Sequence, residues 1–221
     1  TRNVHDPCRR PAPDAQLEPM TDLVTIRSGD LTAAINPFGA ELTHLRDAGG
    51  RELMTNADPA FWTGHAPILF PVIGMTYEKA IRLDGTSYPM AKHGFARHAL
   101  FDTVAQSDAS VTFALTDNAE TRAAYPFAFR LEITFTLQDA TLHVEARIHN
   151  PATEPMPASF GFHPAFAWPL PYGQDRAAHR IVWFLTIGGL GAWHIADELS
   201  IFRVLLPTYG IQFLSTHGTV G

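Results

Sequence analysis

The stretch RLEITFTLQDATLHVEARIH, residues 130–149, alternates apolar and polar side chains in two runs that meet at Asp139-Ala140. The apolar positions are Leu131, Ile133, Phe135 and Leu137 in the first run, and Leu142, Val144, Ala146 and Ile148 in the second. Period two over this length predicts two antiparallel strands, each with one buried and one solvated face. Asn150-Pro151 ends the second strand, because proline cannot continue a ladder.

The same alternation extends outward along the chain. Short strands are predicted within residues 23–46, and Asp84-Gly85 reads as the turn of a hairpin formed by residues 81–88. The only helical candidate is residues 117–125, with Asp117 or Asn118 as its N-cap. The sequence therefore predicts an all-β fold of two packed antiparallel sheets.

The bulk composition excludes several function classes. A length of 221 residues suits one β-sandwich domain, and a net charge of −6 makes nucleic acid an unfavourable partner. A single cysteine, Cys8, forms no internal disulfide and favours a reducing compartment. The longest apolar stretch, residues 181–195, is interrupted by glycines and shorter than the ~20 residues that a membrane span needs. We expect a cytoplasmic protein, monomeric or homodimeric, that contacts neither nucleic acid nor a membrane.

Two segments differ from ordinary strand sequence. They are KHGFARH, residues 92–98, and FGFHPAFAW, residues 160–168, and each places a histidine beside glycine and aromatic residues. Glycine permits close backbone approach, aromatic faces suit the C–H face of a sugar ring, and histidine exchanges protons near neutral pH. His93 and His163 are therefore the candidates for chemistry. A lone histidine in a β-protein is more often structural, and we assign no function to the other nine of the 11 histidines.

These segments, with NPFGAELTHL at residues 36–45 and APILFPVIG at residues 66–74, resemble the aldose 1-epimerase family. The resemblance is closest to the branch of LacX-like proteins and hexose-6-phosphate mutarotases, and it covers about residues 23–175. It implies a galactose-mutarotase-like β-supersandwich and interconversion of the α and β anomers of a hexose or hexose 6-phosphate, without a cofactor or metal. It further implies that His163 is the general acid, that His93 hydrogen-bonds the sugar, and that Arg97 binds an anionic or hydroxyl-rich part of it.

The resemblance ends near residue 180. The family's base is a glutamate on a late strand, but the surroundings of Glu198 do not match that motif, so no base is assigned. We expect three parts: a disordered or non-native tail at residues 1–19, a sandwich domain at 20–180, and a divergent segment at 181–221. A frameshift, a truncation and an unfamiliar completion of the sheet all remain open for that segment.

Three other function classes are weighed. A non-catalytic carbohydrate-binding protein of the same fold is the main alternative to a mutarotase. A metal site lacks the usual ligand spacings, such as HExxH or paired cysteines. Hydrolase and nucleotide chemistry lack the G-x-S-x-G and phosphate-loop motifs.

Overall fold

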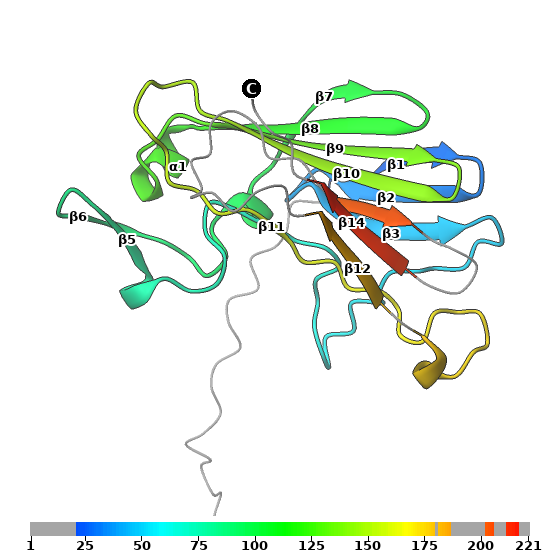
Figure 1. Ribbon diagram of the computed structural model, residues 1–221. Helices are drawn as coiled ribbons and strands as arrows, with labels where there is room; N and C mark the ends of the chain where they lie inside the picture. Colours follow the sequence, from blue (N-terminus) through cyan, green and yellow to red (C-terminus); the bar gives the residue numbers. More distant parts are fainter. Residues whose placement is uncertain (1–20, 180, 187–201, 206–210, 217–221) are drawn as a thin grey trace, which may run out of the picture.

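The computed structural model describes residues 21–179, 181–186, 202–205 and 211–216 (Figure 1). The expected tail of residues 1–19, with Cys8, and the unassigned Glu198 lie outside these ranges.

A three-stranded antiparallel sheet begins the described chain. It consists of β1 (Val24–Ser28), β2 (Leu31–Asn36) and β3 (Glu41–Asp47), in that order. Gly29 forms the β1–β2 turn at a φ of 51°, a conformation that glycine adopts without a steric penalty. The strands predicted within residues 23–46 are confirmed.

The larger sheet has seven strands in the order β12-β14-β13-β10-β9-β8-β7 (Figure 1). The strands are β7 (Asp102–Gln106), β8 (Ser110–Thr116), β9 (Arg130–Gln138), β10 (Thr141–His149), β12 (Ile181–Thr186), β13 (Phe202–Leu205) and β14 (Ile211–Thr216). β12 and β14 run parallel, and all other neighbours in this sheet are antiparallel.

The central hairpin agrees with the sequence prediction at both ends. Arg130 pairs with His149 and Gln138 with Thr141, so Asp139-Ala140 is the turn. Buried and partly exposed positions alternate along both strands. The prediction of two half-buried strands is confirmed.

The two sheets enclose one apolar core. Ile26, Ile35 and Leu45 of the small sheet are fully buried in the same cluster as Phe113, Leu131 and Ile133 of the large sheet. β1 and β2 both contact β9, so the small sheet lies across the face of the large one. The chain therefore has the predicted all-β sandwich architecture.

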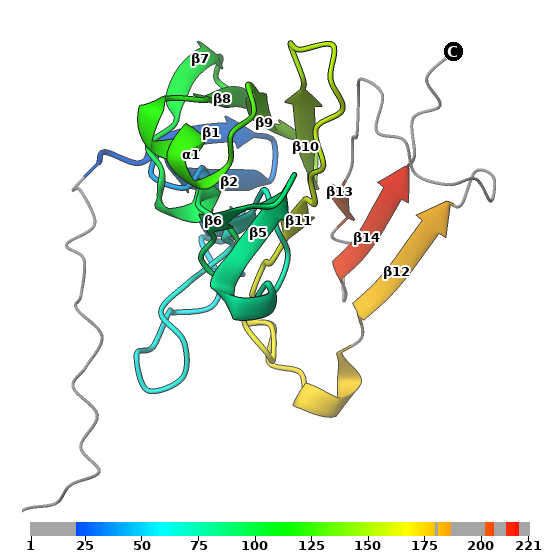
Figure 2. The ribbon, with the colours of Figure 1, turned by 90° about the vertical axis from the view of Figure 1, so that its left-hand side faces the viewer.

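The remaining elements are short. They are β4 (Ile68–Leu69), β5 (Ala80–Leu83), β6 (Thr86–Pro89), β11 (Gly161–Phe162), the helix α1 (Ala119–Ala124), and the 3₁₀ turns η1 (Tyr77–Lys79), η2 (Ala96–His98) and η3 (Arg176–Ala178). Asn118 caps α1 through a hydrogen bond from the Thr121 amide, as one of the two predicted caps. The Asp84-Gly85 hairpin is confirmed as β5–β6, which projects from the side of the molecule that Figure 2 faces.

Candidate functional site

The two unusual segments are brought together by a two-stranded ladder. In it, Gly161 pairs with Leu69 and Phe162 pairs with Ile68, so β11 leads directly into His163 while β4 leads into Phe70. The contact continues on both sides, where Ser159 N–H donates to Pro71 O and Ala165 N–H donates to His65 O, both at 2.8 Å. The segment that contains His163 is therefore fixed along the segment of residues 65–71.

Gly94 fixes the other segment against the same strand. Its φ is +75°, and a Cβ on it would stand 2.0 Å from the carbonyl oxygen of Phe70. That oxygen accepts hydrogen bonds from the amides of Phe95, at 3.0 Å, and Ala96, at 3.2 Å. We expected glycine here to permit close approach of a ligand, but the close approach is to the neighbouring backbone.

His93 is held by Gly74 at two points. Its amide donates to Gly74 O at 2.7 Å, and its Nδ1 accepts from Gly74 N–H at 3.0 Å. Because Nδ1 accepts, the neutral ring carries its proton on Nε2. Burial lowers the pKa of His93, and the positive charges of Lys92, Arg97 and His163 lower it further. His93 is thus a neutral donor through Nε2.

His163 lies beside His93, as the sequence-based hypothesis requires. Their ring centroids are 6.3 Å apart and the rings are tilted by 47°. His163 also contacts Trp62, whose ring centroid is 5.1 Å away in an edge-to-face arrangement. The sequence analysis missed Trp62, whose only signal was an aromatic residue in a loop of turn-forming residues.

The predicted aromatic platform differs from expectation. Phe160 and Phe162 pack edge to face with each other, 4.9 Å apart, and both lie against the hydrophobic core. The aromatic side chain that touches a candidate histidine is Trp62. Phe160 and Phe162, which neighbour His163 in the sequence, therefore pack against the core of the sandwich.

Arg97 belongs to the same loop as His93 and lies near it, since its charge contributes to lowering the pKa of His93. Its Nε is buried and has no hydrogen-bond partner among the described residues. The Arg97 backbone is packed against Gly39, where a Cβ would lie 2.9 Å from the Arg97 oxygen. The NPFGAEL segment thus positions the loop that contains Arg97, whose buried Nε has no partner among the described residues.

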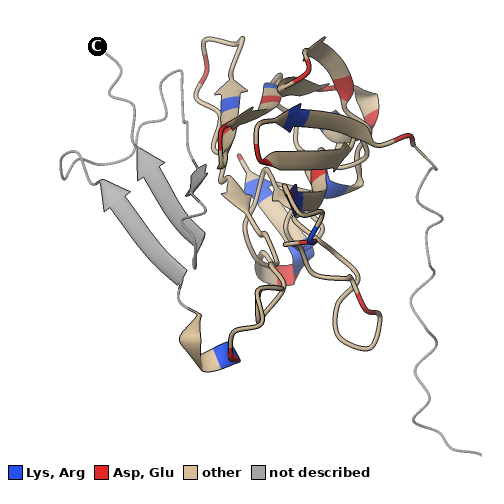
Figure 3. Ribbon diagram, turned by 90° about the vertical axis from the view of Figure 1, so that its right-hand side faces the viewer, with Lys and Arg blue, Asp and Glu red and all other residues tan. Residues whose placement is uncertain are grey.

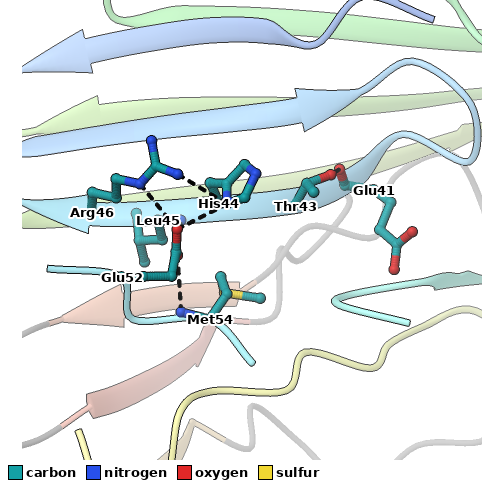
Figure 4. A network of polar contacts seen from close by, with 7 residues as sticks. All are labelled: Glu41, Thr43, His44, Leu45, Arg46, Glu52 and Met54. Atoms are coloured by element: carbon teal, nitrogen blue, oxygen red, sulfur yellow. Dashed lines mark hydrogen bonds and ion pairs between the residues drawn. The ribbon is translucent and has the colours of Figure 1, made fainter. Parts of the chain in front are cut away.

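Two of the histidines without an assigned function, His44 and His65, have structural contacts. His44 Nδ1 lies 2.8 Å from Glu52 Oε2, and Glu52 Oε1 accepts from the amides of Leu45 and Met54 (Figure 4). His65 donates its amide to Glu41 Oε1 at 2.7 Å. These contacts anchor the loop after β3, beside which the His163 segment runs.

Within the described residues, no three histidine, cysteine, aspartate or glutamate side chains are grouped to hold a metal ion. A search of the described helices finds none with the length and apolar content of a membrane span. Along the described part of the ribbon, Lys and Arg residues are interspersed with Asp and Glu residues (Figure 3).

Comparison with known proteins gives a consistent result for most of the chain. The sequence profile of the family described as Aldose 1-epimerase matches residues 22–182. Protein LacX of Lactococcus lactis is 33% identical over 162 residues, which cover 68% of this chain and 52% of that protein. The chain thus spans about half the length of the LacX relatives it matches.

Two solved structures are similar in sequence and fold. A galactose mutarotase related enzyme from Lactobacillus acidophilus is 34% identical with a TM-score of 0.67, covering 70% of this chain and 52% of that one. A galactose mutarotase-like protein from Lactobacillus casei is 41% identical with a TM-score of 0.65, covering 68% and 52%.

A short match of another kind also exists. Over 41 residues, 19% of this chain, the sequence is 51% identical to a protein named "Probable potassium transport system protein Kup 1" from Rhizorhabdus wittichii. The match covers 6% of that protein, so it carries no argument about the activity of this chain.

Proposed function

Since this chain belongs to the aldose 1-epimerase family, in its LacX-like branch, we propose that it interconverts the α and β anomers of a hexose or hexose 6-phosphate. The observation that carries the proposal is the approach of His93 and His163, 6.3 Å between ring centroids, from two distant segments of the sequence. Two proton-exchanging rings at this spacing can reach the same hemiacetal group.

The proposed reaction opens and recloses the sugar ring by paired proton transfers. Protonated His163 donates a proton to the ring oxygen while a base removes the proton of the C1 hydroxyl, and the C1–O5 bond breaks to give the open aldehyde. Rotation about C1–C2 presents the other carbonyl face, and the reverse transfers close the ring. His93 donates from Nε2 to a sugar oxygen, because Nδ1 is already bonded to Gly74.

The charges near His93 support a phosphorylated substrate. The groups that lower its pKa through their charge are Lys92, Arg97 and His163, all of which are or can become positive. Arg97 also has a buried Nε without a partner in the described part of the chain. We propose that Arg97 binds the phosphate of a hexose 6-phosphate, since a guanidinium group is well matched to phosphate oxygens.

The test of activity is the relaxation of optical rotation, or of anomeric NMR signals, in freshly dissolved galactose, glucose and glucose 6-phosphate. We expect a rate above the spontaneous one. We also expect His163→Ala to lower the enzymatic rate by about 10²-fold or more, which is typical for loss of a general acid. His149→Ala is the matched control, because His149 is exposed at the end of β10. A wild-type rate equal to the spontaneous rate would contradict the proposed function.

The alternative function is sugar binding without catalysis. It is favoured because no carboxylate of the described residues is among the groups that shift the pKa of His93, and no base is assigned to this chain. It predicts saturable binding of galactose or glucose 6-phosphate by calorimetry with no acceleration of anomerisation. Activity in the wild type that is lost in His163→Ala would reject this alternative.

We also propose the three-part division of the chain into residues 1–19, 20–180 and 181–221, with residues 181–221 as a divergent segment whose strands β12, β13 and β14 continue the large sheet. The end of the family match at residue 182 supports it. The nucleotide sequence around codon 180 of an independently isolated gene is the test. If another reading frame downstream of codon 180 encodes the family's glutamate motif, the reading frame of this chain is interrupted there.

A further inference from the structure

Trp62 packs edge to face against His163, with 5.1 Å between the ring centroids. Trp62 is 37% exposed, so part of the residue faces solvent beside His163. A large aromatic ring left partly open next to a polar site is unusual, because tryptophan is highly buried on average.

The position of the indole is set by its own loop. Asp58 O accepts hydrogen bonds from the amides of Phe61 and Trp62, both at 2.9 Å, and Asp58 Oδ1 accepts from Ala60 N–H at 2.8 Å. The indole then folds over Gly64, where a Cβ would stand 2.6 Å from Trp62 Cζ2. The hydrogen-bonded turn at Asp58 thus fixes the backbone of Trp62, and the absence of a side chain at Gly64 leaves room for its indole.

A second exposed apolar residue, Ile73, lies near the two histidine segments. Ile73 is 54% exposed and lies next to Gly74, the partner of His93. A Cβ on Gly161 would lie 3.2 Å from Ile73 Cδ1, which places Ile73 beside the strand that leads into His163. Trp62 and Ile73 therefore each lie close to a segment that contains one of the candidate histidines.

We propose that Trp62 stacks on the C–H face of the pyranose ring and determines which sugars the site accepts. The inference rests on the proposed sugar site and deepens it. The polar edge of the sugar then faces His93 and His163, and the apolar face covers the exposed part of the indole. Sugars that present several C–H groups on one face are preferred, because an aromatic ring face carries partial negative charge and C–H groups carry partial positive charge.

The test measures the binding of D-galactose and D-glucose 6-phosphate to the full chain. Calorimetry gives Kd, and NMR saturation transfer from the indole protons shows which sugar protons lie against the ring. We expect Trp62→Ala to raise Kd about tenfold, a typical value for loss of one aromatic contact. Transfer to the protons of one sugar face disappears in the same variant. Phe61→Ala is the matched control, because Phe61 is adjacent and 89% exposed, and among the described rings it packs against neither histidine.

Gly64→Ala tests the proposal without altering the indole. Its backbone is outside the left-handed region, so the new methyl group displaces the Trp62 side chain and leaves the turn intact. We expect Kd to rise by about threefold or more, because the stacking surface shifts.

The possible outcomes separate the two proposals. A wild type that binds either sugar, together with unchanged Kd values in Trp62→Ala and Gly64→Ala, overturns the role of Trp62 and leaves the proposed function standing. A wild type without saturable binding of either sugar overturns both proposals. Loss of binding in Phe61→Ala equal to that in Trp62→Ala would also overturn the role, since it would reflect loss of the loop.

Discussion

His93 shows how one backbone contact selects the chemical form of a catalytic candidate. The Gly74 amide donates to Nδ1, and burial together with nearby positive charge lowers the pKa of the ring below the 6.5 of a free imidazole. The unfolded chain therefore takes up its proton at a higher pH than the folded chain does. The free energy of unfolding falls as the pH drops through 6.5 towards the folded-state pKa, and it recovers above that window.

We predict that NMR titration of His93 gives a midpoint below 6.5 and an Nε2–H tautomer at neutral pH. Protonation removes the lone pair that accepts from Gly74, so the Gly74 amide signal should shift with the same midpoint. A midpoint at or above 6.5, or a ring protonated on Nδ1 at neutral pH, would contradict the arrangement of Gly74 and His93.

Gly94 and Gly85 allow the cost of a steric clash to be compared with the cost of a left-handed backbone conformation. Both have positive φ, but a Cβ on Gly94 would stand 2.0 Å from Phe70 O, whereas a Cβ on Gly85 would meet nothing within 4 Å. We predict that Gly94→Ala lowers the free energy of unfolding by about 3 kcal/mol or more, because strain and clash combine. Gly85→Ala should cost only about 1–2 kcal/mol, the cost of the left-handed conformation. Urea denaturation of both variants gives the comparison, and equal losses would rule out a clash at Gly94.

At the scale of elements, Glu52 joins β3 to the loop that follows it. Burial alone would raise the pKa of Glu52, but the amides of Leu45 and Met54 and the His44 ring outweigh it and hold the pKa below 4.5. The stabilisation is therefore present above pH 4.5 and is lost as the pH falls through the folded-state pKa.

We predict that Glu52→Ala lowers the free energy of unfolding by about 2 kcal/mol at neutral pH, because two amides and the His44 ring lose their acceptor. Glu145→Ala is the control, since its ion pair with Arg147 is exposed and should contribute less than about 0.5 kcal/mol. The difference between the two variants should shrink in acid, where Glu52 is protonated. Equal effects at neutral pH would show that the Glu52 contacts do not stabilise the loop.

The sequence predicted some elements better than others, for physical reasons. The β9–β10 hairpin was predicted to the residue because one of its faces is buried and the other solvated along its whole length. β7 was missed because all five of its residues are exposed, which leaves no alternation to detect. β4 and β11 were missed because two-residue strands carry no period, although they bring the two histidine segments together.

The candidate site was predicted in part. His93 and His163 were chosen on their glycine and aromatic neighbours and lie beside each other in the fold. Trp62 was missed because its contact with His163 spans a hundred residues of sequence and depends on the loop turn at Asp58. No local pattern encodes such a contact, which arises only when the sheets pack.

For the whole molecule, strand position in the large sheet should determine local stability. β8, β9 and β10 each pair with two neighbours, whereas β7 pairs with β8 alone among the described strands. We predict that amide hydrogen exchange is slowest in β9, around Leu131 and Ile133, and fastest in β7 among residues 102–149. Exchange in β7 as slow as in β9 would show that a second chain covers this edge, and it would favour a homodimer over a monomer.

The β5–β6 hairpin has a practical consequence. Its tip at Asp84-Gly85 is exposed, a Cβ on Gly85 meets no atom within 4 Å, and the hairpin projects from the sandwich in Figures 1 and 2. Surface turns of this kind accept added residues without disturbing the core. A fluorophore, an affinity peptide or a small guest domain can therefore be inserted at this turn, which makes it the natural attachment point for immobilising the protein.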